Sequence, residues 1–66
     1  MENSKIIESA ELMYEFDFEN YISKFSEDEI NMALENAKMY CDEDYAACAF
    51  LGFLDGISFN KSIVNK

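Results

Sequence analysis

The 66-residue sequence contains no proline and only two glycines, so it lacks the residues that most often interrupt helices. It also lacks internal repeats, low-complexity tracts and linker-like segments. The residues that are present include many Glu, Ala, Lys, Met and Leu, which favour helices. We therefore expect a single helical domain that spans residues 1–66.

The sequence has no histidine and only two cysteines, Cys41 and Cys48. Two cysteines cannot complete a four-ligand zinc site, and neither has a histidine to act as its base. No catalytic triad, phosphate-binding loop or dinucleotide-binding fingerprint is present, and Asp42–Asp44 does not continue into an EF-hand loop. We expect no metal, no cofactor and no enzymatic activity, and we interpret both cysteines as small buried apolar side chains.

The N-terminal residues MENSKIIESAEL show neither the basic start nor the apolar run of a signal peptide. No apolar segment reaches the roughly 20 residues that cross a bilayer. We therefore expect a cytoplasmic protein that does not enter a membrane and whose thiols stay reduced.

The most apolar segment is Tyr45–Phe59, in which 11 of 15 residues are apolar. These residues would run almost all the way round a helix, which is typical of a helix buried on every side. A chain this short has a small core and usually gains stability from tight packing or from oligomerisation. We expect Tyr45–Phe59 to be the central helix, covered by the flanking segments and by a second copy of the chain.

Helix-boundary signals divide the rest of the chain. Ser4 is the expected N-cap of a first helix, and Ser26 with Glu29 matches a capping box. Asp42–Asp44 provides a short turn and a cap before the central helix. These signals predict an all-α fold, a small bundle of three or four helices.

The expected centre of this fold is an antiparallel helical hairpin of residues 27–41 and 44–60, because the turn between them is short. The end of the second helix stays open. It either stops at Asp55, with Gly56 in a left-handed cap, or continues to about residue 61. We favour continuation because the apolar face does not end at Gly56.

The segment Tyr14–Glu19 reads YEFDFE and is ambiguous. Strict alternation of aromatic and acidic residues is a strand signal, but the apolar residues on both sides of it continue one helical face. We favour a helix with a break near Asp17, because a strand would need the tail Ile57–Val64 as its partner.

The net charge of −9 is unevenly distributed. Residues 1–44 carry 13 acidic residues and three lysines, whereas residues 45–66 carry one acidic residue and two lysines. This distribution argues against direct DNA or RNA binding, and it would attract the chain to a basic protein surface. The alternative is that the acids only form a solvated, solubilising face. The residues with which we expect a basic protein partner to be bound are Glu8, Glu11, Glu15, Glu19, Glu27 and Asp28.

The ten aromatic residues are more than one small core can hide, so we expect some of them at an interface. Cys48, Gly52 and Gly56 recur every four residues and would let another helix approach closely. Two alternatives are that Gly52 makes room for a core phenylalanine and that Gly56 is a helix cap. The residues that we expect in a homodimer interface are Cys48, Gly52, Phe53, Gly56 and Phe59.

In size, acidity and lack of motifs, the chain is similar to the small accessory proteins of phages and plasmids, many of which bind and block a host enzyme. By this similarity we expect a small acidic interaction module of a phage or mobile element. It would inhibit a host nucleic-acid-handling or defence protein, with its carboxylates standing in for phosphates. Two alternatives are an oligomeric protein that sequesters a nucleotide or similar ligand, and a structural or regulatory subunit. The ligand in the first alternative would be bound by Ser58, Asn60, Lys61 and Ser62.

Overall fold

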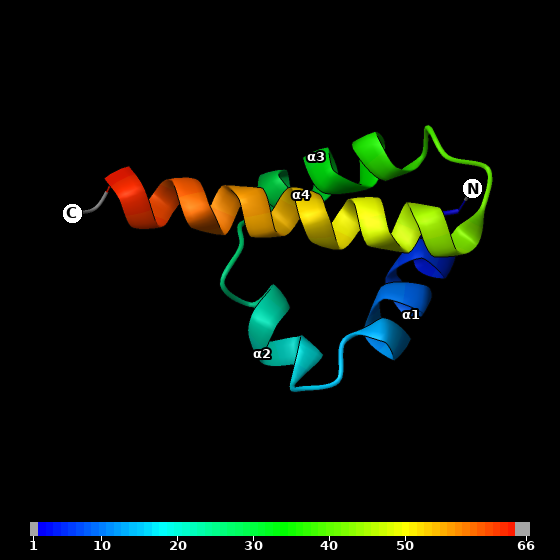
Figure 1. The fold of residues 1–66 in the computed structure, drawn as a ribbon, viewed down its shortest axis with the longest axis horizontal. Coiled ribbons are helices and arrows are strands. Elements are labelled where there is room, and N and C mark those ends of the chain that lie inside the picture. Colours follow the sequence, from blue (N-terminus) through cyan, green and yellow to red (C-terminus); the bar gives the residue numbers. More distant parts are fainter. Residues whose placement is uncertain (1, 65–66) are drawn as a thin grey trace.

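Four helices form the structure, and none of residues 2–64, which the computed structural model describes, lies in a strand. The helices are α1 (Asn3–Met13), α2 (Phe18–Ile22), α3 (Glu27–Ala37) and α4 (Glu43–Val64). Figure 1 shows α4 running along the length of the molecule, with α3 beside it and α1 and α2 below. The predicted all-α bundle is confirmed.

The core lies against one side of α4. The helix α4 has 22 residues and is about 33 Å long, in a molecule whose longest dimension is 37 Å. The helices α1 and α3 pack against it, and α2 is joined to it by the hydrogen bond from Tyr21 to Asp55. Ala46, Phe50 and Leu54 are fully buried, and they recur every four residues on one face of α4. Several core residues are alanines, which let α1 and α3 approach α4 closely. The other buried residues of this cluster are Ile6, Ala10, Phe18, Phe25, Ala33, Leu34, Ala37 and Ala47.

The predicted capping box opens α3. The Ser26 hydroxyl accepts a hydrogen bond of 3.1 Å from the Glu29 N–H, and Glu29 Oε1 accepts one of 2.8 Å from the Ser26 N–H. The helix ends at Ala37, four residues before the predicted boundary, because Met39 and Tyr40 bond back only three residues and tighten the chain into a turn. The hairpin of residues 27–41 and 44–60 is therefore realised as α3 and α4, with a shorter first helix and a longer second one.

Asp42 caps α4, as the sequence predicts. Its Oδ1 accepts hydrogen bonds from the N–H groups of Asp44 at 2.9 Å and Tyr45 at 3.1 Å. The helix passes through Gly56 without interruption and reaches Val64, so the favoured continuation is confirmed and the left-handed cap at Gly56 is wrong. No described residue has a positive φ angle, so Gly56 does not adopt the left-handed conformation that such a cap requires.

The start of α1 differs from the prediction. The helix begins at Asn3 with Glu2 at the N-cap, so the assignment of Ser4 as the cap is wrong. The N–H groups of Lys5 and Ile6 bond to the Glu2 carbonyl, which places Ser4 inside the first turn. This start has no side-chain cap.

The ambiguous segment is a helix break followed by a short helix. Tyr14 is extended, and the Asp17 side chain accepts a hydrogen bond of 3.2 Å from the Asn20 N–H to cap α2. The break near Asp17 is thus confirmed, and the strand alternative is wrong. The break lets Tyr14 stack on Tyr21, with ring centroids 4.6 Å apart, while Tyr21 packs edge-on against Phe25 at 5.3 Å.

Candidate interaction surfaces

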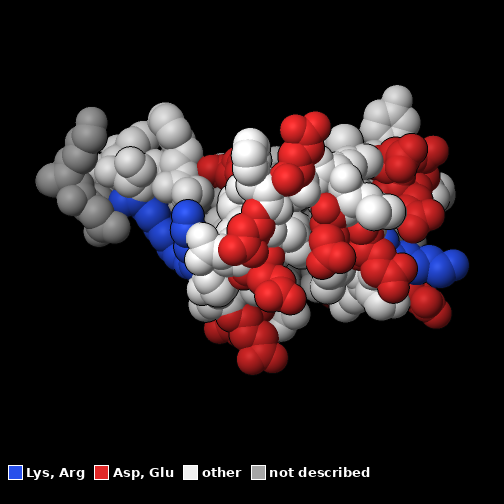
Figure 2. All heavy atoms as spheres, turned by 90° about the horizontal axis from the view of Figure 1, so that it is seen from below, with Lys and Arg blue, Asp and Glu red and all other residues white. Residues whose placement is uncertain are grey.

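An acidic surface lies mainly on α1, α2 and the beginning of α3. We define it by the six acidic residues that the sequence singled out: Glu8, Glu11, Glu15, Glu19, Glu27 and Asp28. All six are exposed, and none of their carboxylates forms a hydrogen bond or ion pair with another described residue. Figure 2 shows acidic side chains spread over the face of the molecule that lies below α4 in Figure 1, with lysines near the two ends. These carboxylates are available to a partner.

The acidic surface is not one helical ridge. Glu8 and Glu11 belong to α1, Glu15 lies in the break, and Glu19 belongs to α2. A continuous helix would have aligned all four, but the chain turns at Tyr14–Asp17 so that the aromatic rings can pack inward. The predicted regular row of carboxylates is therefore replaced by two short acidic helices joined by an acidic turn.

Several acidic residues outside the acidic surface have structural roles. Asp55 accepts a hydrogen bond from the Tyr21 hydroxyl, and Glu43 accepts one of 2.8 Å from Ser9, which joins α4 to α1. Glu29 contacts Lys61 at 2.9 Å. The hydrogen bond from the Ser26 N–H, and then that from Lys61, hold the pKa of the Glu29 carboxyl below its usual value.

A second surface covers the side of α4 that faces away from the core. Because an α-helix turns about 100° per residue, Gly52 lies opposite Phe50 and Leu54. Tyr45 is 69 % exposed, Phe59 is 64 % exposed and Ile63 is 54 % exposed along this side. We call this side the outer α4 face and define it by Tyr45, Cys48, Gly52, Gly56, Phe59 and Ile63. The expectation that Tyr45–Phe59 is buried all round therefore fails within one chain.

The glycines of α4 do not make room for core residues. A Cβ atom built at Gly52 or at Gly56 would meet nothing within 4 Å, which rules out the alternative that Gly52 accommodates a phenylalanine. The four residues Cys48, Gly52, Gly56 and Phe59 of the predicted homodimer interface lie together on the outer α4 face. Phe53 is half-buried and packs against the core instead.

The cysteines are exposed, so their assignment as buried apolar side chains is wrong. Cys41 lies in the turn before α4, and Cys48 lies on the edge of the outer α4 face, where its Sγ is 3.9 Å from the Met13 sulfur. Neither is in a disulfide. The described residues contain no group of three or more potential metal ligands.

The residues predicted to bind an anionic ligand do not converge. Lys61 turns inward to Glu29 and to the ring of Phe25, whose centroid is 5.6 Å from Nζ. Ser58 and Ser62 lie one helical turn apart on the same side of α4, but Asn60 lies on a different side, and the lysine of this set is already paired with Glu29.

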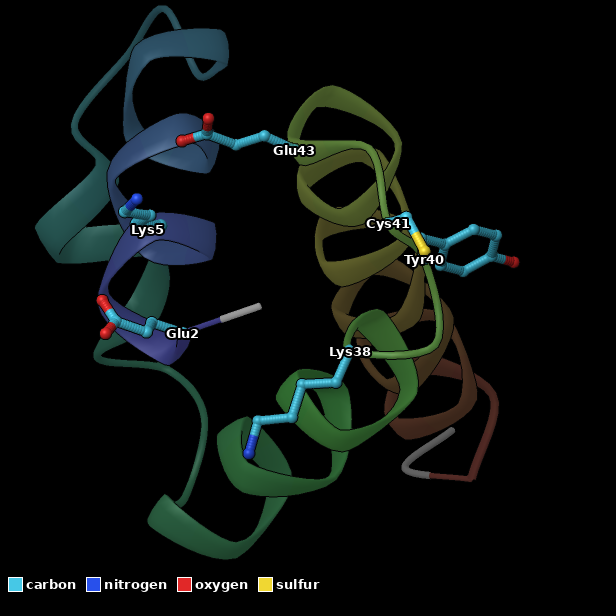
Figure 3. A pocket seen from close by; sticks show the side chains of 6 residues that line it. All are labelled: Glu2, Lys5, Lys38, Tyr40, Cys41 and Glu43. Carbon is cyan, nitrogen blue, oxygen red and sulfur yellow. The ribbon is translucent and has the colours of Figure 1, made fainter.

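An open depression of about 600 Å³ lies elsewhere, between the start of α1 and the α3–α4 turn. Figure 3 shows Lys38 and Tyr40 extending away from its centre, and Lys38 is 3.2 Å from Glu35. The other lysine of the lining, Lys5, is accompanied there by two acidic residues, Glu2 and Glu43. This arrangement does not form an anion site. The lining residues are Glu2, Lys5, Lys38, Tyr40, Cys41 and Glu43.

A comparison with known protein families, with curated proteins and with solved structures finds no match for this sequence. Among the residues that the structure describes, no helix combines the length and the apolar character needed to cross a bilayer. The two surfaces therefore have to be interpreted from their own chemistry.

Proposed function

We propose that this chain is a small acidic interaction protein that binds a basic protein and blocks the site at which that protein binds nucleic acid. The observation that carries the proposal is the acidic surface itself. Six exposed carboxylates without partners occupy α1, the break, α2 and the start of α3, while the acids that bond to other side chains of the fold lie elsewhere. Glu19, Glu27 and Asp28 also lie in the first turns of α2 and α3, where the helix dipole favours acids. The other three carboxylates have no such role in the fold, so an external contact explains them better.

The class of partner follows from charge. A surface that binds DNA or RNA is rich in lysine and arginine and recognises a dense row of negative charges. The chain has a net charge of −9, and residues 1–44 account for all of this excess. Such a charge accelerates association with a basic surface and repels nucleic acid. We therefore propose a host nucleic-acid-handling or defence enzyme as target, and a phage or mobile element as the setting.

The experiment is a capture followed by competition. The tagged chain is incubated with lysate at low salt, and the captured protein is identified and purified. A duplex DNA competitor should release it, and the chain should in turn displace a labelled duplex from it. Because the Debye length falls from about 10 Å at 0.1 M salt to about 3 Å at 1 M, the affinity should drop steeply as salt is raised. Binding that is insensitive to both salt and DNA would refute the proposal.

A matched pair of variants separates the acidic surface from net charge. Glu11→Gln with Glu15→Gln removes two charges from that surface, and Glu2→Gln with Glu35→Gln removes two charges outside it. All four side chains are exposed, so both variants should fold like the native chain. The first pair should weaken binding of the captured protein by at least tenfold, and the second pair should have a much smaller effect. Equal effects would indicate a nonspecific attraction.

We also propose that the chain self-associates through the outer α4 face. The support is the exposure of Tyr45, Phe59 and Ile63 on one side of α4, where each keeps more than half of its surface exposed. Self-association would place this face inside a homodimer and leave the acidic surface outside, available to the partner.

A further inference from the structure

The outer α4 face has a symmetric pattern about Gly52. Cys48 and Gly56 lie four residues before and after Gly52, and Tyr45 and Phe59 lie seven residues before and after it. The large residues are therefore at the two ends and the small ones in the middle. Within the described structure, the helix is continuous over this whole range, so the symmetry of the sequence is also a symmetry in space.

We propose that two copies of the chain pack their outer α4 faces together in antiparallel orientation, with a two-fold axis through Gly52. This inference rests on the proposed self-association and specifies its geometry. In a two-fold interface the same patch is used by both copies, so each residue before Gly52 faces its counterpart after Gly52. Tyr45 then packs on Phe59 of the second copy, and Cys48 lies against Gly56 of the second copy. Large side chains meet at the ends, and small residues let the backbones approach in the middle.

Charge favours this occupant and this direction. Each copy has a net charge of −9, and none of the six residues that define the outer α4 face is charged, although the exposed Asp55 borders it. Two copies can meet here with their acidic surfaces apart. An antiparallel pair keeps the acidic starts of α4, at Glu43 and Asp44, at opposite ends of the dimer. A parallel pair would bring the acidic starts together and repel.

The end of α4 adds a second argument. Every residue of the range 58–63 is exposed, and Figure 1 shows these turns extending beyond α2 and α3. Isolated helical turns are only marginally stable in water, and Phe59 and Ile63 leave apolar surface uncovered here. In the antiparallel arrangement the second copy places Tyr45 and its α3–α4 turn over this end. The exposed end of α4, residues 58–63, is thus covered by Tyr45 of the second copy, which is also exposed in the single chain.

The size of the contact predicts a reversible dimer. A fully covered aromatic side chain buries about 150–250 Å², so Tyr45 and Phe59 at their observed exposure offer on the order of 250 Å² per copy. The rest of the face is narrow and lined by small residues. The total stays below the roughly 800 Å² per partner of a standard interface. We expect dissociation at concentrations of about micromolar order.

Disulfide trapping tests the orientation and register. In a chain with Cys41→Ser and Cys48→Ser, Gly52→Cys should form a disulfide-linked dimer under mild oxidation, because the residue on the axis faces itself. A Cβ atom has room at this position in the single chain. The matched control is Ser58→Cys in the same background, an exposed position on the same helix away from the outer face, which should not form a disulfide between two copies.

Cys48 separates the two orientations. In a chain with only Cys41→Ser, the two Cys48 residues of the proposed dimer are eight positions apart along the helix, about 12 Å, which exceeds the roughly 7 Å limit for a disulfide. Adding Gly56→Cys should produce efficient cross-linking, since Cys48 faces that position. Rapid cross-linking of Cys48 to itself would show a parallel pair and overturn the proposal.

Sedimentation of the native chain separates failure of the geometry from failure of self-association. A monomer at all concentrations up to about a hundredfold above the expected micromolar range would refute both. A dimer whose Gly52→Cys variant does not cross-link would refute only the antiparallel register. Circular dichroism of each variant confirms that it is folded, so a missing disulfide can be assigned to distance.

Discussion

The Tyr21 hydroxyl of α2 donates a hydrogen bond of 2.5 Å to Asp55 Oδ1 in the middle of α4, across 34 residues of sequence. The helix α2 has only five residues, and Tyr21 lies between Tyr14 and Phe25. This hydrogen bond, together with the buried Phe18, holds a helix against α4 that is too short to be stable alone. It also explains why an acid interrupts the most apolar segment of the chain.

The Tyr21–Asp55 pair predicts a loss of stability at high pH. Burial raises the pKa of Tyr21 above its usual range, and the hydrogen bond to Asp55 and the charge of Asp55 raise it further. The folded chain thus keeps a proton that the unfolded chain loses near pH 10. The resulting stabilisation is complete below about pH 10 and is lost as pH rises through the folded-state pKa.

Denaturant unfolding of the native chain and of Tyr21→Phe, between pH 8 and pH 12, measures this contribution. The free energy of unfolding of the native chain should fall more steeply above about pH 10 than that of Tyr21→Phe. Parallel curves would show that Tyr21 does not contribute to the alkaline loss.

The capping box of α3 predicts a cost for Ser26→Ala. Loss of a serine N-cap destabilises a helix by about 1 kcal/mol, and here the hydroxyl accepts the Glu29 N–H. Ser4→Ala is the control, because Ser4 lies inside the first turn of α1 and should change stability by less than about 0.5 kcal/mol. Thermal or urea unfolding distinguishes the two, and a larger effect at Ser4 would contradict the assignment.

The lowered pKa of Glu29 predicts that the folded chain loses stability in acid. Its pKa is held low by the hydrogen bond from the Ser26 N–H and then by Lys61. The stabilisation is therefore present above the unfolded pKa of about 4.3 and is lost as pH falls through the lower folded-state pKa. Glu29→Gln should be less stable than the native chain at pH 7, and the difference should shrink towards pH 3. A difference that does not depend on pH would contradict this.

Truncation of two phenylalanines of α4 should have very different effects on stability. Phe50 is fully buried, so Phe50→Ala should cost about 3–5 kcal/mol, enough to unfold much of a protein this small. Phe59 is 64 % exposed, so Phe59→Ala should change the stability of the dilute monomer by less than about 0.5 kcal/mol. Equal losses at low concentration would mean that Phe59 is buried in the single chain.

Gly52 should tolerate a large side chain within the monomer but not within the dimer. A Cβ atom there meets nothing within 4 Å, and alanine is favoured over glycine in a helix by about 1 kcal/mol. Gly52→Ala should therefore stabilise the dilute chain. Gly52→Leu should also fold, yet its bulk should separate the two α4 helices and raise the dimer dissociation constant by at least tenfold. If sedimentation shows that Gly52→Leu dimerises as tightly as the native chain, the two α4 helices do not approach closely at Gly52.

The helical fold follows from local features of the sequence. The box of Ser26 and Glu29 and the Asp42 cap act within three residues, so the sequence alone is enough to predict their hydrogen bonds. The break near Asp17 is also local, because its side chain caps α2.

Which apolar residues of α4 become buried was decided by the tertiary structure. The segment Tyr45–Phe59 is apolar on nearly all sides, but α1, α2 and α3 are too short to surround a helix of 22 residues. They cover one side, so Phe50 is buried while Phe59, Cys48 and Gly52 remain exposed. Composition sets how much apolar surface there is, whereas the number and placement of neighbouring helices determine which part of it faces water.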